Sequence, residues 1–361
     1  MCRQSSRASR RPHFCWFVAA PLVALEACQA SASSPPEALP AGQADAAVGP
    51  CLAQTHPILA QQILTVPRSE LVAMDPNGSQ SITIGRGSFT YGSTWSPDGR
   101  SIAFRRRPVT DLASVPTELG LLAPDEPGNE VVLLIDSEPV HDGINRRAPD
   151  GPTWSPDGRE LAFASRREAD YYRIWVMARS GGQARLLLPE LEDVPHFHPR
   201  WSPGDSTRLA YIAEIDGVQD LWIVDLGSGE QQRLTFGQMD KLESPRWSPD
   251  GERLAFSALP RDSLDELGSQ FDIYVVDLAS AELQRITRDT GTNVDPAWAP
   301  DGSSLLVSST RDAEVAGPFR TLNLWRVWLD ASRAPQRLTR ASSSSTGADW
   351  YRFSDCGRSA R

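Results

Sequence analysis

Hydrophobic and polar positions alternate in short runs along most of the chain, and each run is ended by Gly, Pro, Asp or Ser. One such run ends at Trp247, and Ser-Pro-Asp-Gly251 and Leu254-Ala-Phe256 follow it. Pro fixes φ, Asp bonds nearby backbone and Gly accepts a positive φ, so this segment predicts a tight turn between two strands. A second hairpin pattern occurs in the same repeat of the chain, as in Leu221–Asp225 followed by Gln232–Thr235. Two hairpins predict a four-stranded antiparallel sheet.

This pattern repeats along the chain. Five clear copies and a degraded sixth are marked by Trp residues 46 to 59 residues apart: Trp95, Trp154, Trp201, Trp247, Trp298 and Trp350. This period is typical of a propeller blade. A sheet that is apolar on both faces must pack against neighbours, so we predict an all-β, six-bladed β-propeller of four-stranded blades. We expect each Trp to pack between neighbouring blades.

The register of the repeat also predicts how the ring closes. The N-terminal strands Gln62–Val66, Glu70–Asp75 and Ser81–Ile84 lack a first strand, and Asp349–Phe353 is a first strand with nothing after it. We therefore expect the N-terminal strands to pair with the C-terminal strand in one shared blade.

The repeat resembles that of TolB-type propellers, which carry this Trp-Ser-Pro-Asp-Gly and Leu-Ala-Phe signature. The resemblance covers about residues 60–357, although the third copy reads Gly204-Asp205 and the fifth has Ala299 in place of Ser. TolB itself has an α/β domain before its propeller, and we expect that domain to be absent here. The resemblance therefore implies the propeller fold and not a role in the Tol–Pal system.

The N-terminus predicts export. Arg10-Arg11 precede an apolar run, Phe14–Leu25, which is shorter than the roughly 20 residues that span a bilayer. Leu25-Glu26-Ala27-Cys28 resembles the lipobox of bacterial lipoproteins, with Glu26 as a departure. We interpret residues 1–27 as a signal peptide, with lipidation at Cys28 or ordinary cleavage as alternatives. Residues 28–50, rich in Ala, Ser, Pro and Gly, are expected to be a flexible linker to the propeller at 51–361.

The net charge and the cysteines of the chain indicate its class of partner and its cellular location. The formal charge is −10, and −13 after loss of residues 1–27. This acidity disfavours nucleic acid, and it limits membrane contact to a lipid anchor. Cys51 and Cys356 flank the shared blade, where a disulfide would join the ends; two free thiols are the alternative. We expect a monomer that is periplasmic or anchored to the outer membrane of a Gram-negative-type bacterium.

The blade topology separates two faces of the ring. The turn face carries the first-to-second and third-to-fourth turns. The loop face carries the second-to-third connections and the blade crossovers. Its variable segments include Arg105–Glu130, Ala164–Arg173, Ala258–Phe271 and Ser308–Asn323. Because loops on a rigid scaffold concentrate binding function, we predict that the loop face binds the ligand.

Five polar residues are candidates for binding at the channel mouth: His196, His198, Glu243, Asp295 and Asp349. Strand alternation would let His196 and His198 point to one side, but a metal would need a third ligand from another blade, which a sequence alone cannot show. The plainer interpretation is two partly exposed histidines beside Pro199. Solvated rim charges are the plainer interpretation of the carboxylates.

Two functions from different classes fit these patterns. The first is a non-catalytic binding protein for a protein or cell-envelope ligand, for which we assign no catalytic residue, metal or cofactor. The alternative is a channel-mouth enzyme, such as a metal-dependent hydrolase, a lactonase or a sugar lyase. A Gly-x-Ser-x-Gly elbow, a His-Glu-x-x-His motif and a phosphate loop are all missing from the sequence.

Overall fold

The described part of the chain covers most of the repeat region. The computed structural model describes residues 52–65, 68–86, 89–107, 117–124, 130–136, 151–169, 171–191, 193–261, 270–288, 291–312, 321–331, 333–339 and 344–351. Every described residue belongs to the compact unit Ala47–Arg361. The predicted signal peptide and linker lie outside the described residues, as do Cys28, Cys51 and Cys356. Lipidation and the disulfide therefore stay predictions.

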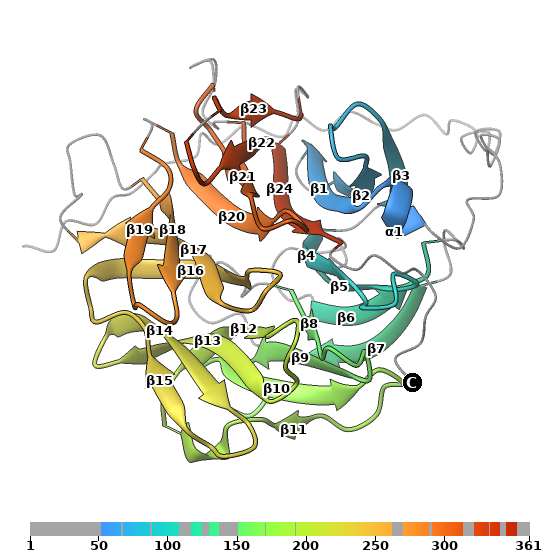
Figure 1. The fold of residues 1–361 in the computed structure, drawn as a ribbon. Helices are drawn as coiled ribbons and strands as arrows, with labels where there is room; N and C mark the ends of the chain where they lie inside the picture. The colour runs from blue at the N-terminus through green and yellow to red at the C-terminus, as the bar shows by residue number, and fades with distance from the viewer. Residues whose placement is uncertain are drawn as a thin grey trace, which may run out of the picture. The chain divides into compact units, whose positions relative to one another are not determined.

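In the described residues, 24 strands form six antiparallel sheets of four strands each, arranged around a common centre (Figure 1). We number the sheets as blades 1 to 6. Blade 1 is β24 (Ser344–Trp350), β1 (Ile58–Thr65), β2 (Arg68–Met74) and β3 (Ser81–Arg86); blade 2 is β4 (Phe89–Trp95), β5 (Ile102–Arg107), β6 (Thr117–Leu122) and β7 (Glu130–Asp136); blade 3 is β8 (Thr153–Trp154), β9 (Glu160–Ser165), β10 (Arg173–Ala178) and β11 (Arg185–Leu186).

The other three blades have the same strand order. Blade 4 is β12 (His196–Trp201), β13 (Arg208–Ile215), β14 (Val218–Asp225) and β15 (Gln231–Arg233); blade 5 is β16 (Met239–Trp247), β17 (Arg253–Pro260), β18 (Asp272–Asp277) and β19 (Leu283–Arg285); blade 6 is β20 (Asn293–Trp298), β21 (Ser304–Ser309), β22 (Asn323–Trp328) and β23 (Gln336–Arg337). A short helix, α1 (Leu52–Thr55), precedes β1, and no helix among the described residues has the length and apolarity needed to span a membrane.

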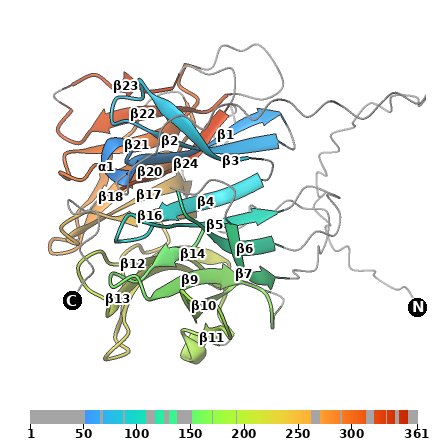
Figure 2. The ribbon, with the colours of Figure 1, turned by 90° about the vertical axis from the view of Figure 1, so that its right-hand side faces the viewer.

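The predicted fold is confirmed: the described residues form a six-bladed, nearly all-β propeller. The first and last strands of the described residues meet in blade 1, where β24 pairs antiparallel with β1 and Ile58 lies opposite Trp350 (Figure 1). The N-terminal strands thus supply the second, third and fourth strands of this blade (Figure 2), as the register predicted. That this pairing holds the ring shut stays a prediction.

The blades pack through apolar side chains that fill the space between neighbouring sheets. Six buried clusters lie between consecutive blades, and the cluster between blades 6 and 1 includes Ile58, Leu306 and Trp350. The six repeat Trp side chains are at most 7% exposed. Their predicted place between blades agrees with these clusters, since burial of such large side chains is a main source of stability.

The buried Trp side chains also connect the blades through hydrogen bonds. The indole N–H of Trp247 donates to the Arg200 carbonyl at 2.8 Å, and that of Trp298 donates to the Arg246 carbonyl at 2.9 Å. Each acceptor is the residue just before the Trp of the preceding blade. Trp201 differs and donates to Ser206 at 3.1 Å within its own turn. This is the copy in which Gly204-Asp205 replaces Asp-Gly.

Candidate functional site

The first strand of most blades has a bulge three residues before its Trp. His198, Ser244 and Asp295 occupy this position with φ of 54°, 54° and 55°, and Gly92 and Gly347 take it with φ of 51° and 61°. The strand pairing is irregular at the same places. A left-handed backbone costs a non-glycine residue about 1–2 kcal/mol. Such strain often accompanies function.

Asp295 connects three neighbouring blades from this strained position. Its carboxylate accepts a hydrogen bond from Ser244 Oγ at 2.9 Å and one from the backbone N–H of Gly347 at 3.2 Å. Its own backbone N–H donates to Ser257 Oγ at 3.1 Å. Blades 5, 6 and 1 are therefore joined around one carboxylate.

Asp349 plays a similar part between blades 1 and 2. Its Oδ2 accepts hydrogen bonds from Thr94 Oγ1 and from the backbone N–H of Trp95, both at 3.0 Å. Thr153 stands at the corresponding position before Trp154, and its Oγ1 accepts from the backbone N–H of Trp201 at 3.3 Å. The residue before the Trp thus repeatedly connects one blade to the next.

A pocket lies among these residues near the turn face. Its volume is about 90 Å³, and Thr94, Thr153, Arg200, Arg246 and Asp349 line it together with repeat Trp and Pro side chains. Arg200 is 7% exposed and Arg246 is 6% exposed. The Arg200 guanidinium donates to the Gly151 carbonyl at 3.1 Å. The pocket is large enough for a few waters or one small side chain.

His196 and His198 have different aromatic neighbours. Strand alternation ends at the bulge between Phe197 and Arg200, so the condition for both imidazoles to share one side is not met. His196 is fully buried, with its ring edge-on to Tyr211 at a centroid distance of 6.4 Å. His198 lies against Phe197 at 5.2 Å.

The remaining candidate, Glu243, is half-buried in β16 opposite Ser257. Within the described ranges, no three His, Cys, Asp or Glu side chains lie close enough together to hold a metal ion. Of the five sequence candidates, the structure places only Asp349 in the pocket. Asp295 instead joins Ser244 in the inter-blade network.

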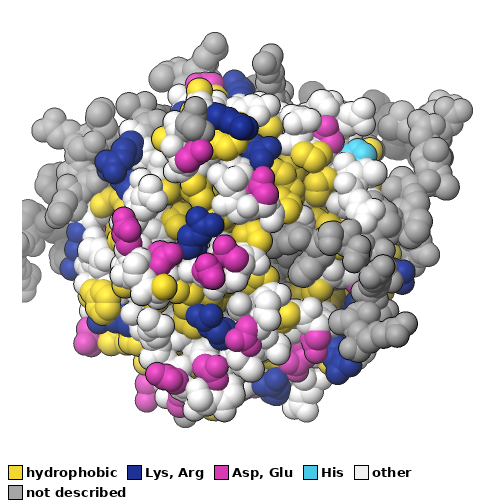
Figure 3. All heavy atoms as spheres, in the orientation of Figure 1, with side chains coloured by type: hydrophobic (Ala, Val, Ile, Leu, Met, Phe, Trp, Pro, Cys, Tyr) yellow, Lys and Arg dark blue, Asp and Glu magenta, His cyan; other side chains and the backbone are white. Residues whose placement is uncertain are grey.

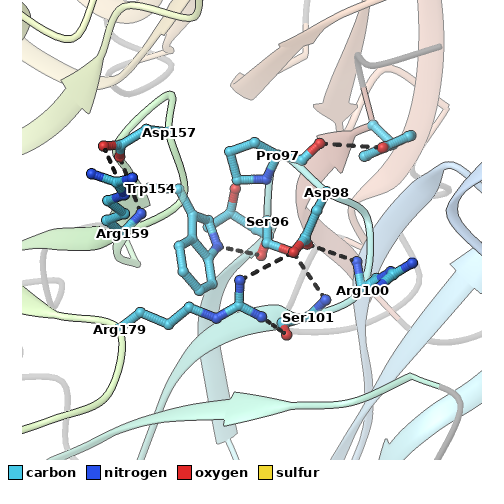
Figure 4. A network of polar contacts seen from close by, with 11 residues as sticks. Ser96, Pro97, Asp98, Arg100, Ser101, Trp154, Asp157, Arg159 and Arg179 are labelled. Atoms are coloured by element: carbon cyan, nitrogen blue, oxygen red, sulfur yellow. Dashed lines mark hydrogen bonds and ion pairs between the residues drawn. The ribbon is translucent and has the colours of Figure 1, made fainter. Parts of the chain in front are cut away.

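The turns of the repeat form polar networks of their own (Figure 4). Arg179 reaches from blade 3 to the turn of blade 2, where its Nη1 lies 3.1 Å from Asp98 Oδ2 and its Nη2 donates to Ser101 Oγ at 2.7 Å. The pKa of Asp98 is lowered overall. Burial alone would raise it, but the hydrogen bonds from Ser96, the Arg100 backbone N–H and Arg179 favour the charged carboxylate and together outweigh burial. These contacts support the interpretation of the motif as scaffold.

On the loop face, the segment Ala164–Arg173 is described almost completely, whereas the other three variable segments have long parts outside the described ranges. It connects β9 to β10 and contains Arg166 and Arg167, beside Arg173 at the start of β10. Arg105, from blade 2, donates to the Ala164 carbonyl at 2.7 Å. Cationic side chains are thus concentrated where blades 2 and 3 meet.

The sequence interpretation missed two sets of residues. Arg200 and Arg246 of the pocket were not singled out, although the residue before each repeat Trp could have been compared between copies. The second set is the buried acids Asp220 and Asp272, which bind Arg233 and Arg285 thirteen residues later, at 2.5 Å in both cases. The repeated Gln-Arg-Leu/Ile-Thr segments were the available signal.

Comparisons with known proteins agree with this architecture. A family model described as "TolB beta propeller domain" matches residues 172–316. The chain is 33% identical to an uncharacterized peptidase, YuxL, of Bacillus subtilis (strain 168), over 44% of this chain and 21% of the relative. It is 32% identical to the Tol-Pal system protein TolB of Alcanivorax borkumensis, over 30% of this chain and 24% of the relative. The chain therefore spans a quarter or less of these two proteins.

A solved structure extends the likeness over the whole fold. The crystal structure of TolB from Acinetobacter baumannii matches with a TM-score of 0.63 and 18% identity, over 82% of this chain and 67% of that chain. The six sheets define the class of protein as a six-bladed β-propeller. Together with the repeat motif, these comparisons support a propeller of the TolB type.

Proposed function

We propose that this protein is an exported, non-catalytic propeller that binds a protein or another cell-envelope component on its loop face. One observation carries the proposal: the carboxylates expected at the channel mouth hold blades together. Asp295 and Asp349 each accept two hydrogen bonds from neighbouring blades. Groups used in this way rigidify a scaffold, and binding on such scaffolds concentrates in the loops.

The likeness to TolB supports a partner that is a protein of the cell envelope, because the relative is described as a Tol-Pal system protein. The predicted signal peptide supports export, to the periplasm or to a lipid anchor in the outer membrane. Both features are compatible with a monomeric binding protein.

The enzyme alternative would require acid and base groups that face a common substrate. The likeness to a peptidase, YuxL, covers 21% of that relative. The alternative has its own readout, which is metal analysis of the purified protein with a thermal shift on adding Ca²⁺ or Zn²⁺. A stoichiometric metal that raises Tm would favour the channel-mouth enzyme over the binding proposal.

Affinity capture from envelope extracts tests the binding face. The bait proteins are the full chain, a variant in which residues 108–116 are replaced by Gly and Ser at equal length, and Arg159→Gln as a control. Arg159 is 84% exposed and directly follows the Trp-Ser-Pro-Asp-Gly motif of blade 3, in the turn before β9 on the turn face. We expect the loop variant to recover an envelope protein several-fold less than the full chain, and the control to recover it normally. Equal recovery of every protein by all three baits would contradict the choice of face.

A further inference from the structure

The connection between β9 and β10 on the loop face carries a compact group of arginines. Arg166 is half-buried and Arg167 is exposed, whereas Arg173, the first residue of β10, is only 7% exposed. Neighbouring blades hold both ends of the hairpin: Arg105 of blade 2 donates to the Ala164 carbonyl at 2.7 Å, and the backbone N–H of His196 in blade 4 donates to the Tyr172 carbonyl at 3.0 Å. These cations therefore stand on a rigid support.

Aromatic rings orient the three guanidinium groups. The Arg166 guanidinium carbon lies 4.5 Å from the ring centroid of Tyr172. Those of Arg167 and Arg173 lie 5.2 and 5.6 Å from the ring centroid of Trp175. Stacking of this kind holds a guanidinium by its face and leaves its N–H edge directed sideways.

Three buried N–H donors of this hairpin have no hydrogen-bond acceptor among the residues that the structure describes: Nε of Arg166, Nε of Arg173 and Nε1 of Trp175. Arg and Trp side chains can donate but cannot accept. The acid in contact with Arg173 is Glu168, whose Oε2 is 3.9 Å from Nη2 and whose side chain is 64% exposed. A pair at that distance and exposure balances little of the cost of burying a guanidinium.

We propose that this hairpin is an oxyanion subsite that takes a carboxylate of the protein partner. The inference rests on the proposed binding function of the loop face and adds the chemistry of the contact. A guanidinium binds a carboxylate through short, charge-assisted hydrogen bonds. Arg167 is exposed and Arg166 is half-buried, so these two side chains are open to a ligand. Donors that are already fixed lose little entropy when they bind.

The charge of the molecule favours a single acidic group over an extended anionic surface. The chain carries a formal charge of −10, and acidic and basic side chains are interspersed in Figure 3. An anionic membrane would meet the repulsion of many acids at once, whereas one carboxylate needs only local cations. We therefore assign the ligand to a protein and treat lipid binding as an outcome of the test.

Fluorescence anisotropy with a labelled hexaglutamate peptide tests the subsite in the full chain. Hexaglutamine serves as the uncharged competitor, and Arg159→Gln on the opposite face of blade 3 is the matched control. We expect Arg166→Gln and Arg173→Gln each to weaken binding about tenfold or more, the typical effect of losing a charge-assisted hydrogen bond. The control should change Kd by less than about twofold, on the scale of surface substitutions. Hexaglutamine should not compete.

Three results would overturn the proposal. These are no saturable binding to the wild-type chain, an unchanged Kd in both hairpin variants, or loss of binding only in Arg246→Gln, which would place the anion in the turn-face pocket. If Arg173→Gln fails to fold, Arg166→Gln alone decides, because its side chain is half-buried. Vesicles of phosphatidylglycerol that bind with the same dependence on Arg166 would contradict a protein ligand. An unchanged Kd with intact partner capture would reject the subsite and leave the proposed function standing.

Discussion

At the scale of single residues, His196 shows how a polar side chain can be fixed within a blade interface. Its Nδ1 lies 2.6 Å from the Val194 carbonyl, which can only accept, so Nδ1 carries the proton. Its Nε2 is buried and has no hydrogen-bond partner among the described residues. Burial lowers the pKa of His196; the bond to Val194 opposes this shift, and the charge of Arg173 adds to it.

This pKa predicts a pH dependence of stability. In the unfolded chain, His196 takes up a proton as pH falls through about 6.5, whereas in the folded protein it resists protonation. The stability that neutral, buried His196 contributes is therefore present above that pH and is lost as the pH falls further. We expect Tm to fall between pH 8 and pH 5, and to fall less in His196→Phe. Calorimetry at the two pH values measures the difference. The same fall in both proteins would contradict the assignment.

The same strand shows what the sequence could not reveal. Alternation was the basis for placing His196 and His198 on one side, and a left-handed residue at His198 ended it. Side-chain periodicity carries no signal for a positive φ. Glycine at the matching positions 92 and 347 was the indirect sign, because glycine takes this conformation freely.

At the scale of elements, the third and fourth strands of blades 4 and 5 share a buried network. Asp272 accepts from Arg285 Nη2 at 2.5 Å and from Thr287 Oγ1 at 2.6 Å, and Thr287 Oγ1 in turn accepts from the backbone N–H of Ile273 at 2.9 Å. Asp220 has equivalent contacts with Arg233 and Thr235 in blade 4. The network fastens the short outer strand to the end of its neighbour.

Asp272→Asn should therefore destabilise the protein by about 1–3 kcal/mol, because Arg285 loses its anionic partner while the site stays buried. Blade 6 has Asn323 at the matching position, bonded to Thr339 at 3.3 Å, so an amide can be accommodated there. Urea unfolding measures the change, with exposed Asp216→Asn as the control. A loss no greater than in the control would show that the network adds no stability.

The strands themselves could be predicted because their alternation and turns recur in every copy. The networks between them could not, because they join residues thirteen or more apart in sequence and depend on strand register. Register also explains the pocket: Arg200 and Arg246 come together only when blades 4 and 5 lie side by side.

At the scale of the whole molecule, the repeat makes one face regular and leaves the other variable. The regular face holds the Ser-Asp turns and the pocket, and the variable face holds the arginine hairpin of blade 3. The fold and the pairing of β24 with β1 followed from the sequence because six copies of one unit fix the ring and its seam. The ligand could not be predicted in the same way, because the loop-face segments share no sequence pattern between copies of the repeat.

Site-specific photo-crosslinking in intact cells tests the central claim that the loop face binds an envelope protein. A photoreactive phenylalanine is placed at Arg167, on the loop face, or at Arg159, on the turn face of the same blade. The account predicts a discrete protein adduct from position 167 and none from position 159. An adduct from position 159 alone, or equal adducts from both, would contradict it.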